Sequence, residues 1–281
     1  MAKVIMIATE KGGVGKTTIT LELCRVLSDQ FRVLAIDFDG QINLSILSGT
    51  YDTDNRENNG TSVFDVLCDT THTSKMKDAI YSNGHYDVLN GDPKLHSTPA
   101  LSSSDAQFYL QDRLAEVNDD YDYILIDCPP ARGAAQEMAI VAADYVLLIS
   151  AADDVMSPEG MANLIADIKL KKSRRISHAE FLGVIMNRYS RKANERETIS
   201  NCYAIAQSEG VHVFDTVIRN STVYNDAHLR NQSVTDYLIS KNLTKSNQRL
   251  FDGYSDLVTI VNEIMERIEL FENGESEGGN N

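Results

Sequence analysis

The sequence of 281 residues predicts an α/β fold with a doubly wound, mostly parallel sheet flanked by helices. Short apolar segments alternate along the chain with longer segments in which apolar residues recur every three or four positions. Residues 32–37, 122–127 and 145–150 are apolar almost throughout, as is typical of strands whose sheet is covered on both faces. Together these patterns indicate parallel strands joined through helices.

The expected elements follow from these segments in chain order. Strands are expected near residues 3–8, 32–37, 86–89, 122–127, 145–150 and 180–186. Helices are expected near residues 16–29, 104–118, 134–143, 157–172, 193–208 and 247–271. Residues 48–60 are polar and rich in Gly, Asn and Asp, which predicts an insertion without regular structure.

The last predicted helix, 247–271, carries an apolar stripe with spacings of three and four residues. The stripe predicts packing on the sheet, and a partner-binding or dimer surface is the alternative. Residues 272–281 are acidic and contain no apolar side chain, so we expect a disordered tail there. Residues 1–271 are then expected to form one domain, which the chain length allows.

The most informative motif is the glycine-rich run that directly follows the first predicted strand. Closely spaced glycines allow several backbone N–H groups to face one anion, and the N-terminus of the next helix adds a positive field. In such a loop Lys16 reaches the β- and γ-phosphates of a nucleotide, and the Thr17 hydroxyl ligates Mg²⁺. The expected nucleotide-binding residues are Lys11, Gly12, Gly13, Val14, Gly15, Lys16, Thr17 and Thr18.

Aspartates follow two further predicted strands. Asp37 and Asp39 come at the end of the second strand, and Asp127 ends the fourth. Because ligands lie beyond the carboxyl ends of the strands in an open parallel sheet, we expect these carboxylates beside the phosphate loop. Mg²⁺ takes only one or two protein carboxylates and keeps several waters. The sequence therefore predicts a metal site formed by Thr17, Asp39 and Asp127, with Asp37 free to serve the loop alone.

The glycine-rich run resembles the deviant Walker A motif of the ParA/MinD superfamily, because Glu10 replaces its first glycine and a second lysine, Lys11, precedes the usual one. Residues 37–43 resemble the D-x-D-P-Q-x-N segment of that family, with Gly40 in place of proline. The resemblance implies a P-loop ATPase with ATP and Mg²⁺ as cofactors. It also implies catalytic roles for Lys11, Lys16 and Asp39: Lys11 crosses to the nucleotide of the partner in an ATP-bound homodimer, and Asp39 positions the attacking water.

Two later segments extend the resemblance to the nucleotide base. Residues 183–188 resemble the strand and loop that contact adenine, which makes Asn187 a candidate base-binding residue. Its alternative is a turn former after a strand. Residues 214–221 resemble a later loop that usually reads I-P-R in the family, and Arg219 stands there in place of the proline. Arg219 is therefore the second candidate near the base.

The resemblance is to the short partition ATPases, which implies that the ATP-bound dimer binds DNA without sequence preference and that a centromere-binding, ParB-like adaptor stimulates hydrolysis and release. The net charge is −15, from 26 Lys and Arg against 41 Asp and Glu, so DNA binding requires local basic patches. The cluster 169–175 can instead complement the C-terminal dipole of its helix. The DNA-binding candidates are Lys169, Lys171, Lys172, Arg174, Arg175, Arg188, Arg191 and Lys192, which Arg196 follows. A second region lies at Lys241, Lys245 and Arg249.

The composition predicts a cytoplasmic protein, and the resemblance implies that it associates with the nucleoid when ATP is bound. No signal peptide is expected, no apolar run reaches about 18 residues, and membrane binding is not expected. The four cysteines lack a C-x-x-C pair, so we expect reduced thiols. The acidic charge keeps open a MinD-like or cargo-positioning switch that does not bind DNA. A metal-cluster carrier would need cysteines paired across a dimer, and a bacterial tyrosine kinase would need a tyrosine-rich tail.

Overall fold

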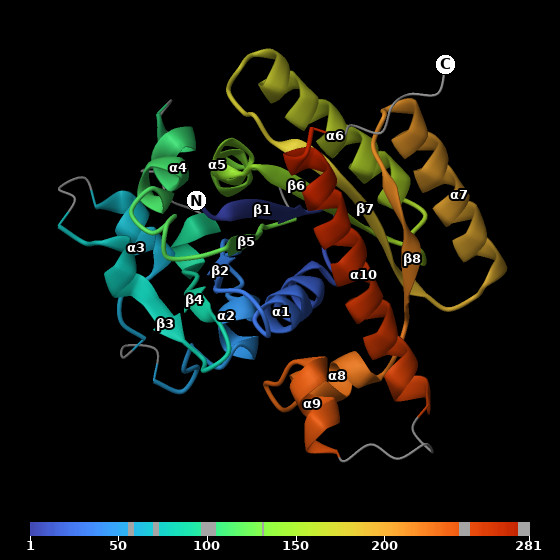
Figure 1. The fold of residues 1–281 in the computed structure, drawn as a ribbon, viewed down its shortest axis with the longest axis horizontal. Coiled ribbons are helices and arrows are strands. Elements are labelled where there is room, and N and C mark those ends of the chain that lie inside the picture. Colours follow the sequence, from blue (N-terminus) through green and yellow to red (C-terminus); the bar gives the residue numbers. More distant parts are fainter. Residues whose placement is uncertain (56–58, 70–72, 97–104, 131, 242–247, 275–281) are drawn as a thin grey trace.

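The computed structural model describes residues 1–55, 59–69, 73–96, 105–130, 132–241 and 248–274, except the side chains of His96 and of residues 248–253. Its centre is an eight-stranded sheet with the order β3-β4-β2-β5-β1-β6-β7-β8. Neighbouring strands are parallel throughout, except that β3 pairs antiparallel with β4 at one edge. Figure 1 shows the sheet running through the middle of the molecule with helices on either side. The predicted fold class is confirmed.

The bounds of the elements are as follows. The strands are β1 (Lys3–Ala8), β2 (Val33–Asp37), β3 (Ile80–Ser82), β4 (Asp87–Leu89), β5 (Tyr123–Asp127), β6 (Tyr145–Ala151), β7 (Glu180–Tyr189) and β8 (Val213–Arg219). The α-helices are α1 (Lys16–Leu27), α2 (Asn43–Leu47), α3 (Val63–Cys68), α4 (Tyr109–Leu114), α5 (Ala134–Ala142), α6 (Ser157–Ser173), α7 (Ala193–Ser208), α8 (Val223–His228), α9 (Val234–Ser240) and α10 (Gln248–Glu272). Short 3₁₀ helices are η2 (Met76–Ala79), η3 (Pro93–His96) and η5 (Ala106–Phe108).

Two apolar cores lie on the two faces of the sheet. One contains residues of α3 to α7, and the other contains residues of α1, α2 and α10. Successive residues of β6 alternate between them: Val146 and Leu148 belong to the first core, whereas Leu147 and Ile149 belong to the second. Since successive side chains of a strand point to opposite faces, burial on both faces explains why this segment is apolar without a break.

Every predicted strand and most predicted helices are present, with ends shifted by a few residues. The predicted packing of the last helix is also confirmed, because its buried side chains join the core around α1 and β8. The predicted helix 104–118 is wrong in extent, since the described part contains only η5, α4 and a turn. The prediction missed β3, β8, α2, α3, α8 and α9. Residues 272–274 end α10 and its turn, and the remainder of the predicted tail lies outside the described residues.

The strand order fixes where a ligand site can form. From β1 the chain moves to one side of the sheet through β2, and it later returns to the other side of β1 through β6. The carboxyl ends of β1, β2, β5, β6 and β7 all lie at one edge because these strands are parallel. The loop after β1 therefore opens at the switch point, where ligands bind in open α/β sheets. Every helix in the described part of the chain is too short or too polar to cross a membrane.

A buried carboxyl group joins α9 to α1. Glu22 of α1 has no exposed surface and accepts hydrogen bonds from the N–H groups of Val234, at 2.5 Å, and Thr235, at 3.5 Å. One turn later, Arg25 pairs with Asp236 at 2.9 Å. Burial raises the pKa of Glu22 to about 7, against the lowering effect of the two backbone donors. The helix that follows the glycine-rich loop thus carries the anchor of α9.

We expect Glu22→Gln to weaken the dependence of stability on pH. The folded chain keeps the Glu22 proton up to about pH 7, whereas the unfolded chain releases it near pH 4.5, so stability falls as the pH rises through this window. A pKa shift of this size corresponds to about 3 kcal/mol. Glutamine keeps an oxygen acceptor for Val234 and has no proton to lose. Urea unfolding of both proteins at pH 5 and pH 8 measures the difference, and equal pH dependence would contradict the raised pKa.

Candidate nucleotide-binding site

The loop between β1 and α1 has the backbone of a phosphate cradle. Gly13 and Gly15 adopt left-handed conformations, with φ of +77° and +91°. Gly15 is the N-cap of α1, and its carbonyl accepts the hydrogen bond of the Ile19 N–H group at 2.9 Å. A Cβ atom at position 15 would also overlap the side-chain amide of Asn187. Both requirements favour glycine there, and the first N–H groups of α1 are left without acceptors inside the helix.

Lys16, Thr17 and Asp127 meet where β1 and β5 end. Lys16 Nζ lies 2.7 Å from Asp127 Oδ1, and Thr17 Oγ1 donates to Asp127 Oδ2 at 2.7 Å. The Lys16 side chain is 6% exposed and that of Asp127 is fully buried. Burial alone would lower the pKa of Lys16, but the charge of Asp127, its hydrogen bond to the ammonium and the charges of Cys128 and Asp39 together outweigh burial and raise that pKa. One carboxylate therefore holds both the ammonium and the hydroxyl that the sequence assigns to phosphate and Mg²⁺.

The two aspartates after β2 have different surroundings. Asp39 is 6% exposed, and its charge contributes to the raised pKa of Lys16. Asp37 is fully buried and accepts hydrogen bonds from the backbone N–H and the hydroxyl of Ser45, at 2.8 and 2.7 Å. Burial, followed by the charge of Asp127, raises the pKa of Asp37 to about 7. Asp37 accordingly anchors the first turn of α2, and Asp39 stays the predicted water-positioning carboxylate.

A cavity of about 330 Å³ opens beside the glycine-rich loop. Asn187 lines it and donates from Nδ2 to the carbonyl of Val14 at 2.7 Å, so it also braces the loop. Arg219 lines it too, and its guanidinium forms two hydrogen bonds with Asp256 of α10 at 2.8 and 2.7 Å. The lining residues are Gly13, Gly15, Thr18, Ile19, Asn187, Arg188, Ile218, Arg219, Asn220, Ser221, Tyr224 and Asn225. The structure therefore brings both predicted base contacts to one cavity.

Two acidic residues of the turn after β6 pair with cations at the same edge. Lys11 Nζ lies 3.0 Å from Asp154, and the guanidinium of Arg188 lies 2.8 Å from Asp153. Arg188 also donates to the carbonyl of Gly13 at 2.5 Å. The structure thus places Lys11 against its own chain, and its contact with a partner's nucleotide stays a prediction.

The predicted DNA-binding residues separate into two groups at opposite edges of the sheet, because α6 runs back from the end of β6 to the start of β7. In the first group Lys169 pairs with Glu209 at 2.7 Å, Lys171 with Glu137 at 3.5 Å and Lys172 with Glu180 at 2.6 Å. Within the described residues, Arg174 and Arg175 have no ion-pair partner. Three of the five cations in this cluster are thus neutralised by neighbouring carboxylates.

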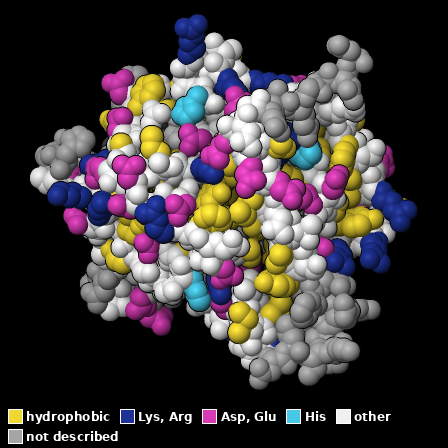
Figure 2. Space-filling view, viewed as in Figure 1, with side chains coloured by type: hydrophobic (Ala, Val, Ile, Leu, Met, Phe, Trp, Pro, Cys, Tyr) yellow, Lys and Arg dark blue, Asp and Glu magenta, His cyan; other side chains and the backbone are white. Residues whose placement is uncertain are grey.

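The second group lies at the carboxyl edge, where the loop after β7 leads into α7. Arg191 and Arg196 are exposed and have no ion-pair partner in the described part of the chain, and Lys192 lies 3.8 Å from Glu195. Figure 2 shows Lys and Arg side chains gathered at the lower right, over this loop and the start of α7. Lys241 is exposed after α9, whereas Lys245 and the Arg249 side chain lie outside the described residues.

The donor atoms at the site fit Mg²⁺ bound largely by water and phosphate. The described residues contain no group of three or more His, Cys, Asp or Glu that could hold a metal ion by itself. Thr17 and Asp127 offer adjacent oxygen atoms beside the loop, which matches an ion that takes one or two protein ligands. Cys24, Cys128 and Cys202 are buried free thiols, which does not favour a cluster shared at a surface between two chains.

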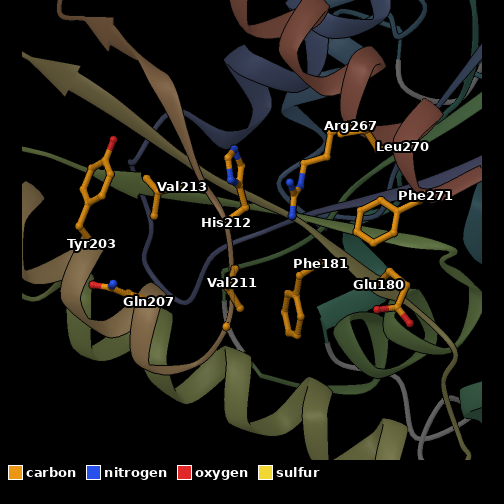
Figure 3. A pocket seen from close by; sticks show the side chains of 11 residues that line it. Glu180, Phe181, Tyr203, Gln207, Val211, His212, Val213, Arg267, Leu270 and Phe271 are labelled. Carbon is orange, nitrogen blue, oxygen red and sulfur yellow. The ribbon is translucent and has the colours of Figure 1, made fainter. Parts of the chain in front are cut away.

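A larger hollow, of about 680 Å³, lies at the opposite edge of the sheet (Figure 3). Phe181, Val211, His212, Arg267 and Phe271 are among the side chains that line it, from the starts of β7 and β8 and from α10. It is remote from the glycine-rich loop because the amino ends of parallel strands lie opposite their carboxyl ends. The smaller cavity is the candidate nucleotide site, since it alone of these two adjoins the loop.

Sequence reasoning missed several residues at the site. Asp153 and Asp154 follow a predicted strand as Asp37 and Asp39 do, so the same reasoning about strand ends points to them. Tyr224 and Asn225 lie on α8, a helix too short to give a periodic signal. Asp256 reaches Arg219 from α10 through a contact between distant segments, which no local pattern indicates.

Comparison with known proteins gives the same picture. Residues 2–180 match a family model described as an AAA domain. An uncharacterized protein of Pseudomonas putida is 33% identical over 224 residues, which cover 78% of this chain and 81% of that protein. The chromosome partitioning protein ParA of Caulobacter vibrioides is 30% identical over 232 residues, which cover 80% of this chain and 83% of ParA.

Solved structures with the same fold include two nucleotide complexes. A variant of McdA from Cyanothece in complex with ATP has a TM-score of 0.79 and 24% identity, over 95% of this chain and 96% of that one. MinD of Pyrococcus horikoshii, complexed with Mg-ADP, has a TM-score of 0.70 and 23% identity, over 99% of this chain and 100% of that one. These likenesses concern the fold.

Proposed function

Because this chain belongs to the AAA-domain family of ParA- and MinD-type P-loop ATPases, we propose that it hydrolyses ATP as a nucleotide-dependent dimer that partitions DNA. The observation that carries the proposal is the meeting of Lys16 and Thr17 at Asp127, each at 2.7 Å, directly beneath a glycine-rich loop. The Caulobacter relative supports a role in partition, and the ATP and Mg-ADP complexes of McdA and MinD support the choice of cofactors.

The chain's own groups divide the work of hydrolysis between binding and positioning. Lys16 leaves Asp127 and pairs with the β- and γ-phosphates, while Gly12, Gly13 and Gly15 let backbone N–H groups face them. Thr17 and Asp127 would hold Mg²⁺, which would neutralise phosphate charge when bound. Asp39 accepts a hydrogen bond from the attacking water and orients it. Asn187 and Arg219 border the part of the cavity that receives the base.

Dimerisation completes the site. In this proposal Lys11 of each copy reaches the nucleotide of its partner and neutralises negative charge there. Phosphoryl transfer depends mainly on positioning and electrostatic stabilisation, so a chain that lacks the second ammonium hydrolyses ATP slowly. A ParB-like adaptor that binds the dimer and favours the transition-state arrangement then sets the rate, and hydrolysis releases the dimer from DNA. The chain acts in the cytoplasm and on the nucleoid.

The DNA-binding surface in this proposal is the carboxyl edge, around Arg191, Lys192 and Arg196. Two observations support the choice over residues 169–175. The arginines of the carboxyl edge are exposed without an ion-pair partner in the described chain, whereas the three lysines of the other cluster are paired with carboxylates. The carboxyl edge also adjoins the nucleotide cavity through Arg188, so DNA affinity can depend on the nucleotide.

We expect ATP-dependent DNA binding that is strongly sensitive to salt. If the dimer contacts six to ten phosphates, the affinity falls by about 10³–10⁵ between 50 and 200 mM salt. The double substitution of Arg191 and Arg196 by Ala removes four cations per dimer and should reduce the slope of log affinity against log salt by about 4. The matched control is the double substitution of Arg174 and Arg175 by Ala. Fluorescence anisotropy with a labelled duplex measures both.

The outcome of that titration also decides between two functions. DNA affinity that is insensitive to salt, or an equal loss in the control variant, contradicts the proposed surface. The second candidate function is a MinD-like or cargo-positioning switch that does not bind DNA, and the net charge of −15 favours it because an acidic surface repels phosphates. Absence of any DNA binding with ATP, in a protein that still binds and hydrolyses ATP, would favour that switch.

A further inference from the structure

We propose that Asp154 is an intramolecular latch that holds Lys11 in the single chain and releases it when two nucleotide-bound copies pair. The inference rests on the proposed function, in which Lys11 acts across the dimer. Its basis is the contact of Lys11 Nζ with both carboxylate oxygens of Asp154, at 3.0 and 3.2 Å. The amine has no other hydrogen-bond or ion-pair partner within the described residues, so one contact decides where it lies.

The turn after β6 fixes the carboxylate in place. The Asp154 N–H group donates to the carbonyl of Ala151 at 3.3 Å, and the Asp154 carbonyl accepts from Ser157 N at 3.0 Å. Its Oδ1 atom also accepts from Met156 N at 3.1 Å. The Asp154 side chain is 21% exposed, whereas that of Lys11 is 47% exposed and follows a flexible stem. In this latch the Lys11 side chain is therefore the group that moves, and the Asp154 carboxylate stays in place.

Exposed apolar side chains lie next to the Lys11–Asp154 ion pair, which fits a surface that a second copy of the chain buries. Val155 and Met156 directly follow Asp154 and are 69% and 52% exposed, although both are apolar. Their burial against a partner is favourable. Dimer formation breaks two Lys11–Asp154 ion pairs, one in each chain. The loss of these charge contacts opposes dimer formation. A nucleotide offers Lys11 a stronger anion than one carboxylate does, so the latch opens only when the partner is loaded.

The expected size of the effect follows from the exposure of the pair. An exposed ion pair changes an equilibrium constant by up to about fivefold. Because each dimer opens two latches, removing them should lower the dissociation constant of the dimer by up to about 25-fold. The gain should shrink as salt is raised, since the latch itself is screened.

The decisive variant is Asp154→Asn, because the amide oxygen still accepts from Met156 N while the charge is lost. Sedimentation with a non-hydrolysable ATP analogue measures the dissociation constant at 50 and 500 mM NaCl. Asp154→Glu should restore wild-type behaviour. The matched control is Asp120→Asn, which removes the same charge from an exposed lysine pair with Lys77, 2.6 Å long and at the other edge of the sheet. A structural effect of the turn alone would not produce the salt dependence or the rescue.

A second measurement tests the latch without a dimer. In the absence of nucleotide, reductive methylation of Lys11, read by peptide mass spectrometry against Lys75, should proceed faster in Asp154→Asn than in the wild-type chain. Equal methylation rates overturn the latch. An equal gain of dimer stability in Asp120→Asn also overturns it, because general charge repulsion then explains the gain. Failure of the wild-type chain to dimerise with the analogue would count against the proposed function, while the methylation rates would still decide the latch.

Discussion

Lys16→Ala should lower the affinity for ATP by about 100-fold or more. A hydrogen bond to a charged group contributes about 1.5–3 kcal/mol, and Lys16 contributes more than one such contact with the phosphates. Lys11→Ala is the matched control in the same loop. Lys11 pairs with Asp154 in the single chain, so its substitution leaves the chain's own phosphate cradle intact. Isothermal titration calorimetry with ATP and Mg²⁺ measures both affinities in dilute protein. Unchanged ATP affinity in Lys16→Ala would contradict the assigned site.

Loss of Lys16 also affects stability, and this effect must be separated from binding. The substitution leaves Asp127 fully buried without its ammonium partner, and an uncompensated buried charge of this kind costs about 3–5 kcal/mol. The double variant Lys16→Ala with Asp127→Asn removes both charges, so it should recover part of that stability in urea unfolding. It should still fail to bind ATP. A folded double variant that binds ATP normally would show that the ammonium is not needed.

The central strands could be predicted because burial on both faces makes their sequences apolar almost throughout. Each residue of β5 is buried, and β6 alternates between two apolar cores, so neither segment has a polar face. The strands at the two ends of the strand order have a weaker apolar pattern. β3 has only three residues, and it is half-buried or exposed at the edge of the sheet. β8 contains an exposed Asp215 and has one strand neighbour, so its pattern resembles that of a loop.

The short helices α8 and α9 depend on contacts that sequence patterns do not reveal. Ser233 caps α9 locally, through its bond from Asp236 N at 3.0 Å. The stronger anchor is Glu22, which lies more than 200 positions earlier in the chain and receives the N–H group of Val234. From the sequence alone, a glutamate in the middle of α1 is expected to be exposed to solvent. Only the fold shows that it serves another element.

The same contrast holds at the site. The proximity of Lys16, Thr17 and Asp127 was predictable because phosphate chemistry favours these residue types at the ends of adjacent strands, and both Lys16 and Thr17 lie 2.7 Å from Asp127. The partners of Lys11 and Arg219 were not, since Asp154 and Asp256 approach from other segments. The sequence thus predicted which side chains meet at the ends of the strands, whereas their ion pairs with distant segments could be seen only in the tertiary structure.

Asp39→Ala should leave ATP bound while lowering its hydrolysis by about 10²–10⁴, the range for loss of a positioned proton acceptor. Asp39 is 6% exposed and its charge contributes to the raised pKa of Lys16, so its removal takes away the carboxylate proposed to orient the water. Binding should change little, because the phosphates are held by the glycine-rich loop. The ATP-bound dimer should therefore accumulate. Phosphate release and sedimentation, measured on the same samples, give the rate and the dimer fraction.

Asp39→Asn separates the chemical role of Asp39 from its structural one. The Oδ1 atom of Asp39 accepts a hydrogen bond from Gln41 N at 3.0 Å, and an asparagine oxygen can keep that bond. If charge orients the water, Asp39→Asn should be as slow as Asp39→Ala, whereas Asp120→Asn should hydrolyse ATP at the wild-type rate. If Asp39→Asn regains the wild-type rate, the residue acts by shaping the loop after β2, and the water must be oriented by another group of the site.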